Sequence, residues 1–384
     1  MNAVVVGGGI VGLSSAFELA ERGVDVVVCE KGSIGNGSTE RAAGGIRAQF
    51  STPTNVELSL ASMAVWSEFE QRFGTDVDYR TNGYLFLART PETAAALETA
   101  VEMQNERGVP SEVLEPAGAH ERCPGIDPDG FVAATYSPTD GFADPHLALQ
   151  GYARAAADAG VDVRTKTPVT DVLREDGDGR VVGVETPDGP LEAEFVVNAA
   201  GPWARRVGAM AGLELPIAPR RRQMVVVDPE TAVPETDPLT IDLETGTYFR
   251  PERDGEALVG GHLGGPDPDR DPDGYDRGID FDWAADVLET ASEWATYFGP
   301  DSRIKRGWAG LYAVTPDDNA VLEETVPGLI TAAGFSGHGF QHAPATGRLV
   351  AELIVDGEAS LVDIAALSSD RFGTERERLE RNVV

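Results

Sequence analysis

A glycine-rich turn close to the start of the chain places the strongest constraint on how this protein can fold. Three valines, Val4 to Val6, lead directly into Gly7-Gly8-Gly9-Ile10-Val11-Gly12, and a helix-forming segment, Leu13 to Arg22, follows. An apolar strand, a G-x-G-x-x-G turn and a helix together make the first half of a dinucleotide-binding βαβ unit. We therefore expect a diphosphate to lie against the free N–H groups and the positive dipole end of this helix.

The residues of this turn are expected to have separate roles. Gly7 allows the tight turn, Gly9 lets the backbone approach a pyrophosphate, and Gly12 lets the helix pack close to the strand. Ile10 and Val11, at the start of the helix, are assigned to the same dinucleotide site.

A second apolar strand, Val24 to Cys29, ends at Glu30, close to the spacing expected for the acid that hydrogen-bonds a ribose hydroxyl. Such an acid favours a ribose with a free 2′-hydroxyl, and therefore FAD or NAD over NADP. We assign the neighbouring Lys31 to the same site. The alternative is a glycine-rich turn that binds no nucleotide, which this second strand and its acid disfavour.

The composition is strongly acidic and nearly free of lysine. The formal net charge is −33, and only Lys31, Lys166 and Lys305 are lysines among 31 basic residues. The acids are spread along the whole chain, whereas an acidic face for a basic partner would predict clustering. We interpret this as halophilic adaptation, because molar salt shortens the Debye length to about 3 Å and makes self-repulsion tolerable. Nucleic acid and anionic membranes are disfavoured as partners.

The chain is expected to be cytoplasmic. Its two cysteines, Cys29 and Cys123, provide no disulfide framework and fit a reducing compartment. The apolar N-terminus lacks the basic region of a signal peptide. No apolar run approaches 18 residues, so no membrane span is expected.

The order of motifs predicts an α/β (α+β) fold with two interleaved domains. Strand–glycine–helix units occur at the start of the chain, near residue 200 and near residue 335, and β-rich segments separate them. We predict a Rossmann-like dinucleotide-binding domain of discontinuous segments and a substrate domain built on a mixed or antiparallel sheet. Their boundaries are residues 1–80, 146–218 and 318–384 for the first domain, and 81–145 and 219–317 for the second. The same patterns predict one helix over 54–73, a hairpin turn at 176–179 and a closing helix over 343–354.

Three blocks together resemble the D-amino-acid oxidase and sarcosine oxidase (glycine oxidase-like) family of FAD-dependent oxidoreductases, over nearly the whole chain. They are the N-terminal glycine motif, Val196 to Gly201 with Trp203, and Ala332-Ala333-Gly334-Phe335-Ser336-Gly337-His338-Gly339-Phe340. The last block is especially similar to monomeric sarcosine oxidase. The resemblance implies an FAD-binding domain and oxidation of a small amino acid or N-methyl amino acid (sarcosine, glycine, D-amino acid or proline class) by hydride transfer to flavin N5.

The resemblance also implies where FAD binds. The late turn would lie by the flavin ring, Val169 would contact the adenine, and Ser38 and Thr39 would approach the diphosphate and ribityl chain. His338 is expected to be a shape or hydrogen-bonding residue rather than a base. The remaining residues assigned to the cofactor are Ala200, Gly201, Gly334, Gly337, Gly339 and Phe340.

Four residues are candidates for the reaction itself. Arg47 is the expected carboxylate anchor, because a guanidinium binds a carboxylate with two parallel hydrogen bonds; the alternative is a surface arginine. His262 matches an active-site histidine of sarcosine oxidase, and Tyr248, on the neighbouring predicted strand, could face the same cavity. Gln341 stands where the family has a lysine that helps hold the carboxylate. No metal site is expected.

The chain departs from the family at two further positions. Gly310 replaces the cysteine that carries the flavin in sarcosine oxidase, so FAD is expected to be noncovalent. Leu258 replaces a lysine used for oxygen activation, which favours a dehydrogenase over an oxidase. The electron acceptor, O₂ or a carrier, stays open. Two other functions stay open as well: a flavin 2-hydroxy-acid dehydrogenase, and a non-catalytic flavoprotein subunit or assembly factor.

An acidic segment, Asp269-Arg270-Asp271-Pro272-Asp273-Gly274 followed by Asp280, nearly fits a calcium-binding EF-hand loop. Its last ligand should be Glu, a proline interrupts it, and neither flank is a good helix. We therefore interpret it as an acidic surface loop.

Overall fold

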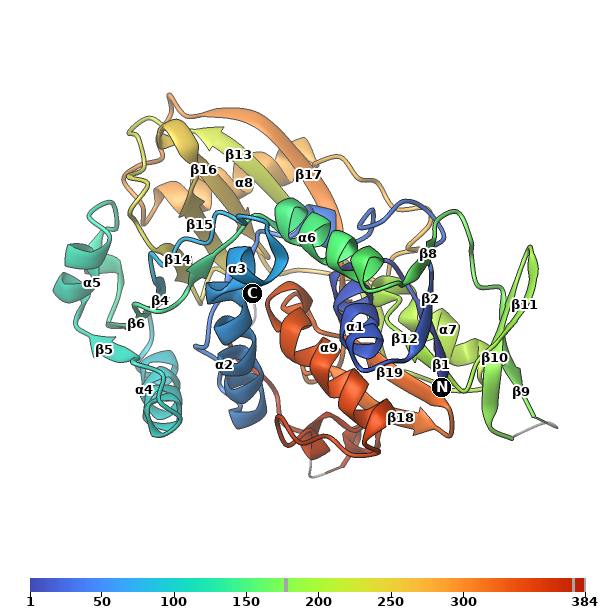
Figure 1. Cartoon of the computed structure of the whole chain (residues 1–384). Helices are drawn as coiled ribbons and strands as arrows, with labels where there is room; N and C mark the ends of the chain where they lie inside the picture. Colours follow the sequence, from blue (N-terminus) through green and yellow to red (C-terminus); the bar gives the residue numbers. More distant parts are fainter. Residues whose placement is uncertain (176–178, 375–376, 383–384) are drawn as a thin grey trace.

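Two sheets organise the molecule. The computed structural model describes residues 1–175, 179–374 and 377–382, so the turn expected at 176–179 lies largely outside the described residues. A six-stranded sheet contains the N-terminal strand, and an eight-stranded sheet comes from the middle of the chain. Figure 1 shows the first sheet with its helices at the lower right and the second sheet at the upper left.

The six-stranded sheet has the order β18-β19-β12-β1-β2-β8. Its strands from β19 to β8 are parallel, and β18 pairs antiparallel with β19. Their bounds are β1 (Asn2–Val6), β2 (Asp25–Cys29), β8 (Asp162–Arg164), β12 (Phe195–Asn198), β18 (Val321–Val326) and β19 (Leu329–Ala333). The parallel strands are apolar on both faces because helices cover one face, and a three-stranded sheet (Asp171–Arg174, Val181–Thr186 and Gly189–Glu192) covers the other together with a further helix.

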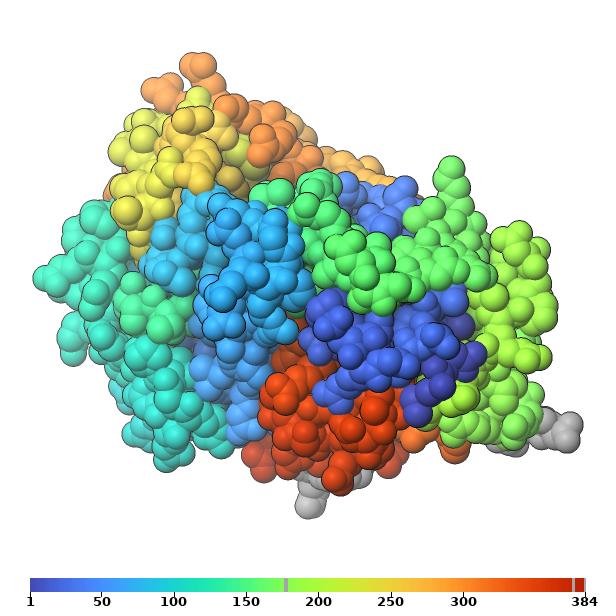
Figure 2. Space-filling model, viewed as in Figure 1, coloured from blue at the N-terminus to red at the C-terminus, as the bar shows by residue number. Residues whose placement is uncertain are grey.

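Helix α1 (Ile10–Glu21) packs against α6 (Pro145–Asp158) and α9 (Gly339–Val355), and α7 (Ala204–Met210) contacts β12. Figure 2 shows the blue N-terminal segment and the red α9 side by side on the surface. Val5, Val28, Val197 and Ile330 in the core below are fully buried. Burying each such side chain contributes about 1.5–3 kcal/mol, so this sheet is a rigid base for the turns at its carboxyl edge.

The eight-stranded sheet has the order β17-β13-β16-β15-β14-β4-β6-β5. Helix α8 (Phe281–Ser292) covers one face, which buries Val225, Phe249 and Val259. Because side chains alternate along a strand, Met224 and Tyr248 point to the opposite face. The strands are β4 (Tyr84–Ala88), β5 (Glu112–Leu114), β6 (Ala133–Ser137), β13 (Ala218–Asp228), β14 (Leu239–Asp242), β15 (Thr247–Pro251), β16 (Ala257–Gly261) and β17 (Arg303–Val314).

The remaining elements connect or flank the two sheets. They are β3 (Gly45–Ile46), α2 (Pro53–Ser67), α3 (Phe69–Phe73), α4 (Pro91–Glu106), α5 (Pro116–Arg122), β7 (Gly141–Phe142), β9 (Asp171–Arg174), β10 (Val181–Thr186) and β11 (Gly189–Glu192). Within the described residues, no helix is long and apolar enough to cross a membrane.

Two expected elements differ from the structure. The helix expected over 54–73 is two helices, because Glu68 leaves helical geometry at φ −110° and ψ 12° between α2 and α3. The closing helix begins at Gly339, four residues before the expected start, although Pro344 lies inside it. The late glycine turn therefore leads directly into the N-terminus of α9.

Candidate cofactor and substrate site

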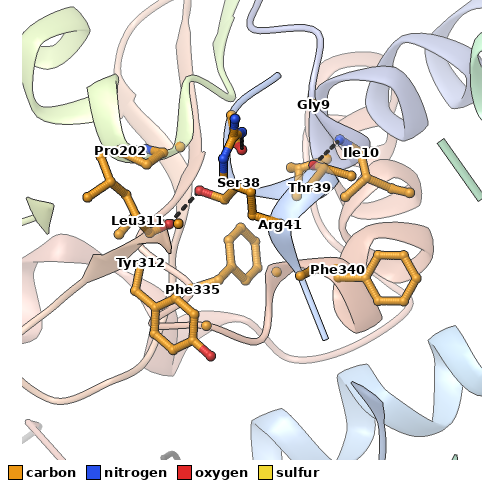
Figure 3. A pocket seen from close by; sticks show the side chains of 18 of the residues that line it. Gly9, Ile10, Ser38, Thr39, Arg41, Pro202, Leu311, Tyr312, Phe335 and Phe340 are labelled. Atoms are coloured by element: carbon orange, nitrogen blue, oxygen red, sulfur yellow. Dashed lines mark hydrogen bonds between the residues drawn. The ribbon is translucent and has the colours of Figure 1, made fainter. Parts of the chain in front are cut away.

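A cavity of about 550 Å³ lies where the carboxyl edge of the parallel sheet meets the open face of the eight-stranded sheet. The turn after β1, the loop 30–47, the turn after β12 and the turn after β19 all contribute to its lining. Figure 3 shows Gly9, Ile10 and Thr39 on one side and Leu311 and Tyr312 on the other, with Ser38 between them and hydrogen-bonded to Leu311. One continuous space therefore joins the dinucleotide motif to side chains of the second sheet.

The first glycine turn forms a cradle that side chains would block. Gly7 has a φ of +112°, and a Cβ there would lie 2.6 Å from the Ala199 carbonyl oxygen. The Thr39 hydroxyl accepts a hydrogen bond of 3.1 Å from Ile10 N at the start of α1 (Figure 3). Gly12 does not line the cavity; a Cβ there would overlap the Gly7 carbonyl oxygen, which is the packing role expected for it.

Glu30 lines the cavity at the end of β2 and orders the two loops beside it. Its Oε2 accepts from Gly8 N at 2.8 Å, and its Oε1 accepts from Gly32 N at 2.6 Å. These bonds fix the carboxylate next to the glycine turn. Each oxygen keeps a further lone pair that could accept from a ribose hydroxyl.

The loop 35–45 is fastened across the cavity to strand β17. The Ser38 hydroxyl donates to the Leu311 carbonyl oxygen at 2.5 Å, and Trp308 Nε1 donates to the Arg41 carbonyl oxygen at 3.1 Å. Arg41 in turn donates to the Asn36 and Gly37 carbonyl oxygens. These contacts hold the loop as a wall of the cavity.

The turn after β19 contains a buried chain of hydrogen bonds. Nε2 of His338 lies 3.0 Å from the Asp318 carbonyl oxygen, which can only accept, so this nitrogen carries the proton. Nδ1 of His338 then accepts from Nδ1 of His342 at 3.1 Å, and Nε2 of His342 accepts from the Ser59 hydroxyl at 2.8 Å. Burial lowers the pKa of both imidazoles. His338 therefore lines the cavity as a neutral, fixed side chain.

Arg47 lines the cavity together with Tyr84 and Tyr248 of the eight-stranded sheet and is 8% exposed. Its NH1 donates to the Gln49 carbonyl oxygen at 2.5 Å, and its NH2 donates to the Asn382 carbonyl oxygen. The guanidinium also lies 3.9 Å from the centre of the Phe50 ring. Burial lowers the pKa of Arg47. Two of the five N–H groups of the guanidinium thus hold it in place, and the other three can donate to a ligand.

Tyr248 and Gln341 line the same end of the cavity. Burial raises the pKa of Tyr248 well above its usual value, so its hydroxyl is neutral. The ring lies over Gly260, where a Cβ would overlap the hydroxyl. Gln341 Oε1 accepts from Arg47 N at 2.8 Å, while its Nε2 is buried and has no protein partner among the described residues. A buried amide donor without a partner is costly unless a ligand accepts from it.

Two residues that the resemblance to sarcosine oxidase singled out, His262 and Leu258, do not line the cavity. His262 follows β16, and its pKa is lowered by burial and by Arg222, while Asp267 raises it. The structure does not place His262 among the residues that line the cavity. Leu258 is 1% exposed and packs in the cluster of Tyr248 and Met224, so it carries no charge to the cavity.

The lining residues that sequence reasoning missed beside the eight-stranded sheet include Tyr84, Arg222, Tyr312 and Asn382. Strand alternation could have found Arg222, since it lies two residues before Met224 on β13. Asn382 carried no signal, because its place depends on a segment that returns to the start of α2. There the Glu380 carboxylate accepts from Ser51 N at 2.7 Å and from Thr52 N at 3.0 Å.

The lining fits FAD. A glycine cradle at a helix N-terminus receives a diphosphate, Glu30 can receive a ribose hydroxyl, and Gln341 Nε2 awaits an acceptor. Val169, Ala200 and Gly201 line the end of the cavity beyond Glu30. Gly310, in the place of the linking cysteine, lines the cavity too. The parallel sheet, the glycine cradle and the cavity between the two sheets together define a dinucleotide-binding protein.

Comparison with known proteins gives the family. A model of the family described as FAD dependent oxidoreductase (DAO) matches residues 2–353, and the chain belongs to this family. It is 32% identical over 429 residues to FAD-dependent oxidoreductase domain-containing protein 1 of Xenopus laevis, across 100% of this chain and 85% of the relative. It is 32% identical over 383 residues to glycine oxidase of Geobacillus kaustophilus, across 96% and 97%.

A solved structure is also similar over the full length. L-proline dehydrogenase from P. horikoshii matches with a TM-score of 0.87 and 35% identity, across 98% of both chains. The protein is therefore an FAD-dependent oxidoreductase of the family that oxidises amino acids and amines, and it has this family's fold.

Proposed function

We propose that the protein oxidises the C–N bond of a small amino acid or N-methyl amino acid, of the sarcosine, glycine, D-amino-acid and proline class. The observation that carries this proposal is the single cavity that joins the glycine cradle to a chamber with a buried arginine. The names of the similar proteins, glycine oxidase and L-proline dehydrogenase, support the same substrate class.

The chamber can orient such a substrate. Arg47 is the anchor for the substrate carboxylate, because its fork is fixed by two carbonyl oxygens and keeps three N–H groups. The hydroxyls of Tyr84, Tyr248 and Tyr312 are neutral, since burial raises the pKa of each, and can donate hydrogen bonds. Met224 and Ile241 exclude water from the remaining surface. FAD, when bound, supplies the hydride acceptor, and the side chains supply orientation.

The test is a substrate panel read from bleaching of the bound flavin without oxygen. The panel contains L-proline, D-proline, glycine, sarcosine, N,N-dimethylglycine and, as the 2-hydroxy acid, L-lactate. Bleaching by one or more of the amino acids and none by lactate is the expected result. Bleaching by lactate alone would move the assignment to hydroxy-acid oxidation. No bleaching by any of these compounds, with FAD bound, would favour a non-catalytic flavoprotein.

We further propose that electrons leave to an acceptor other than O₂. Leu258 places no charge at the cavity, and catalysis of oxygen reduction needs charge where negative charge develops. The reduced protein should therefore reoxidise slowly in air and quickly with a dye acceptor. Equal rates would make the protein an oxidase.

A further inference from the structure

The acidic segment that resembled a calcium loop has a different environment in the structure. Between β16 and α8 the aspartates alternate along the chain, and each of the first four meets basic side chains. Arg222 pairs with Asp267 through two hydrogen bonds of 3.0 and 2.9 Å, and Arg220 lies 3.0 Å from Asp269. The carboxylates of this segment are therefore paired with arginine side chains, and the segment forms a series of ion pairs.

These ion pairs connect the eight-stranded sheet with a helix that packs on the six-stranded sheet. Arg220 and Arg222 belong to β13 of the eight-stranded sheet. Further along, Arg206 of α7 donates to Asp271 Oδ1 and to Asp273 Oδ2, both at 2.6 Å. Residues 267–273, which we call the aspartate strap, therefore connect the substrate sheet to a helix of the dinucleotide-binding sheet.

Asp273 lies at the mouth of the cofactor cavity. It lines the cavity, and so do its three partners, Lys31, Trp203 and Arg206. Trp203 Nε1 donates to Asp273 Oδ1 at 3.0 Å, and Lys31 Nζ donates to the same oxygen. The Lys31 ammonium also lies 4.1 Å from the centre of the Trp203 ring. One carboxylate thus links the residue after Glu30 to the turn after β12, across the end of the cavity that lies beyond Glu30.

The strap has the properties of a latch rather than of a permanent wall. Lys31, Arg206, Asp271 and Asp273 have side chains between 44% and 61% exposed. An exposed ion pair stabilises a structure only weakly, and several charges in a network stabilise it more. Because these contacts lie at the surface, they can break without unfolding either sheet.

We propose that the aspartate strap closes the adenosine end of the cavity and controls the release of FAD, with Asp273 as the latching residue. In this proposal the strap opens before the cofactor leaves, because Asp273 and its partners Lys31, Trp203 and Arg206 all line the cavity and are bonded to one another. This role depends on FAD binding and is independent of which substrate is oxidised. Because the contacts are ionic and exposed, the rate of FAD release depends on salt.

The experiment compares the rate of FAD release from wild type, Asp273→Asn, Asp271→Asn and Asp286→Asn. Asp286 is exposed on α8, so Asp286→Asn makes the same change in charge away from the strap. The rate is followed by the fluorescence of released flavin after dilution, at the lowest salt concentration at which circular dichroism shows every protein folded. Melting temperatures of the apoproteins show whether a variant acts through global stability.

We expect release to be five- to tenfold faster for Asp273→Asn, about twofold faster for Asp271→Asn, which loses contact with Arg206 alone, and unchanged for Asp286→Asn. In 1 M salt the difference should shrink, since the Debye length falls from about 10 Å at 0.1 M to about 3 Å. Equal release from all four proteins, or equal acceleration in Asp273→Asn and Asp286→Asn, would overturn the latch. Acceleration that follows a fall in apoprotein melting temperature would overturn it as well.

Discussion

The two ends of the cavity are built in different ways. The diphosphate end consists of backbone N–H groups and glycines that lie within a few residues of one another, from Gly7 to Val11. The substrate end consists of side chains from distant segments, such as Arg47, Tyr248 and Gln341. Backbone geometry in a short turn is set by local sterics, whereas convergence of remote side chains is set by packing. One substitution in the glycine turn should therefore abolish FAD binding altogether. Each substitution at the substrate end should remove only the contribution of that side chain.

The largest effect is expected from Gly7→Ala. A Cβ at Gly7 would lie 2.6 Å from the Ala199 carbonyl oxygen at a φ of +112°, so the backbone must shift. We expect a loss of about 2–4 kcal/mol in the free energy of unfolding and a protein purified without flavin. The matched control is Gly23→Ala, at a φ of +79° with open space around the Cβ. It should cost about 1 kcal/mol and keep the yellow colour. A yellow Gly7→Ala protein would break the comparison.

The second effect concerns a buried acid at the substrate end. Asp140 is fully buried, and burial raises its pKa from 3.8 to about 6, although Ala48 N and Gln49 donate to it. The folded protein therefore binds a proton that the unfolded chain releases between pH 4 and 6. This contribution to the free energy of unfolding falls as pH rises through that window, by roughly 3 kcal/mol.

Asp140→Asn removes this dependence. Its stability relative to wild type should rise between pH 4 and pH 7, as measured by thermal unfolding in molar salt. Asp318, whose pKa burial also raises to about 6, stays in both proteins and cancels from the difference. A difference in stability that is flat with pH would mean that Asp140 is ionised normally.

The third effect tests the anchor. Arg47→Ala should weaken binding of the amino acid that bleaches the flavin fastest by roughly tenfold to hundredfold, about 1.5–3 kcal/mol. FAD affinity should hardly change, because Arg47 contacts Gln49 and Asn382 rather than the glycine cradle. Arg47→Lys keeps the charge and loses the fork, so an intermediate effect is expected. If flavin reduction shows an unchanged dependence on substrate concentration, the anchor lies elsewhere.

The smallest effect is expected from Tyr248→Phe. Loss of one neutral hydrogen bond costs about 0.5–1.5 kcal/mol, so the rate of flavin reduction at low substrate should fall about two- to tenfold. Tyr152→Phe is the matched control, because Tyr152 is 1% exposed in the core beside Trp66 and does not line the cavity. Equal effects of the two variants would show that Tyr248 acts through packing alone.

Much of the FAD-binding half could be predicted from the sequence. The glycine turn, Glu30 and the late glycine turn all line the cavity, because strand, turn and helix signals are local and parallel strands end at the same edge. Prediction failed at Glu68, where the backbone leaves helical geometry and the expected single helix divides. It was also incomplete for Tyr84 and Tyr312, which neighbour the chamber only because their strands share one sheet.

By itself the sequence determined that the chain binds a dinucleotide at a helix N-terminus and that no cysteine at residue 310 can carry the flavin. Both conclusions follow from short stretches of chain in which glycine, which has no side chain, occupies the deciding position. Only the tertiary structure decided that Arg47 is fixed by Asn382, that His262 lies outside the cavity lining, and that Asp273 bridges Lys31 and Arg206. These contacts join residues up to 335 positions apart. No local pattern specifies them, because they exist only once the two sheets have packed against each other.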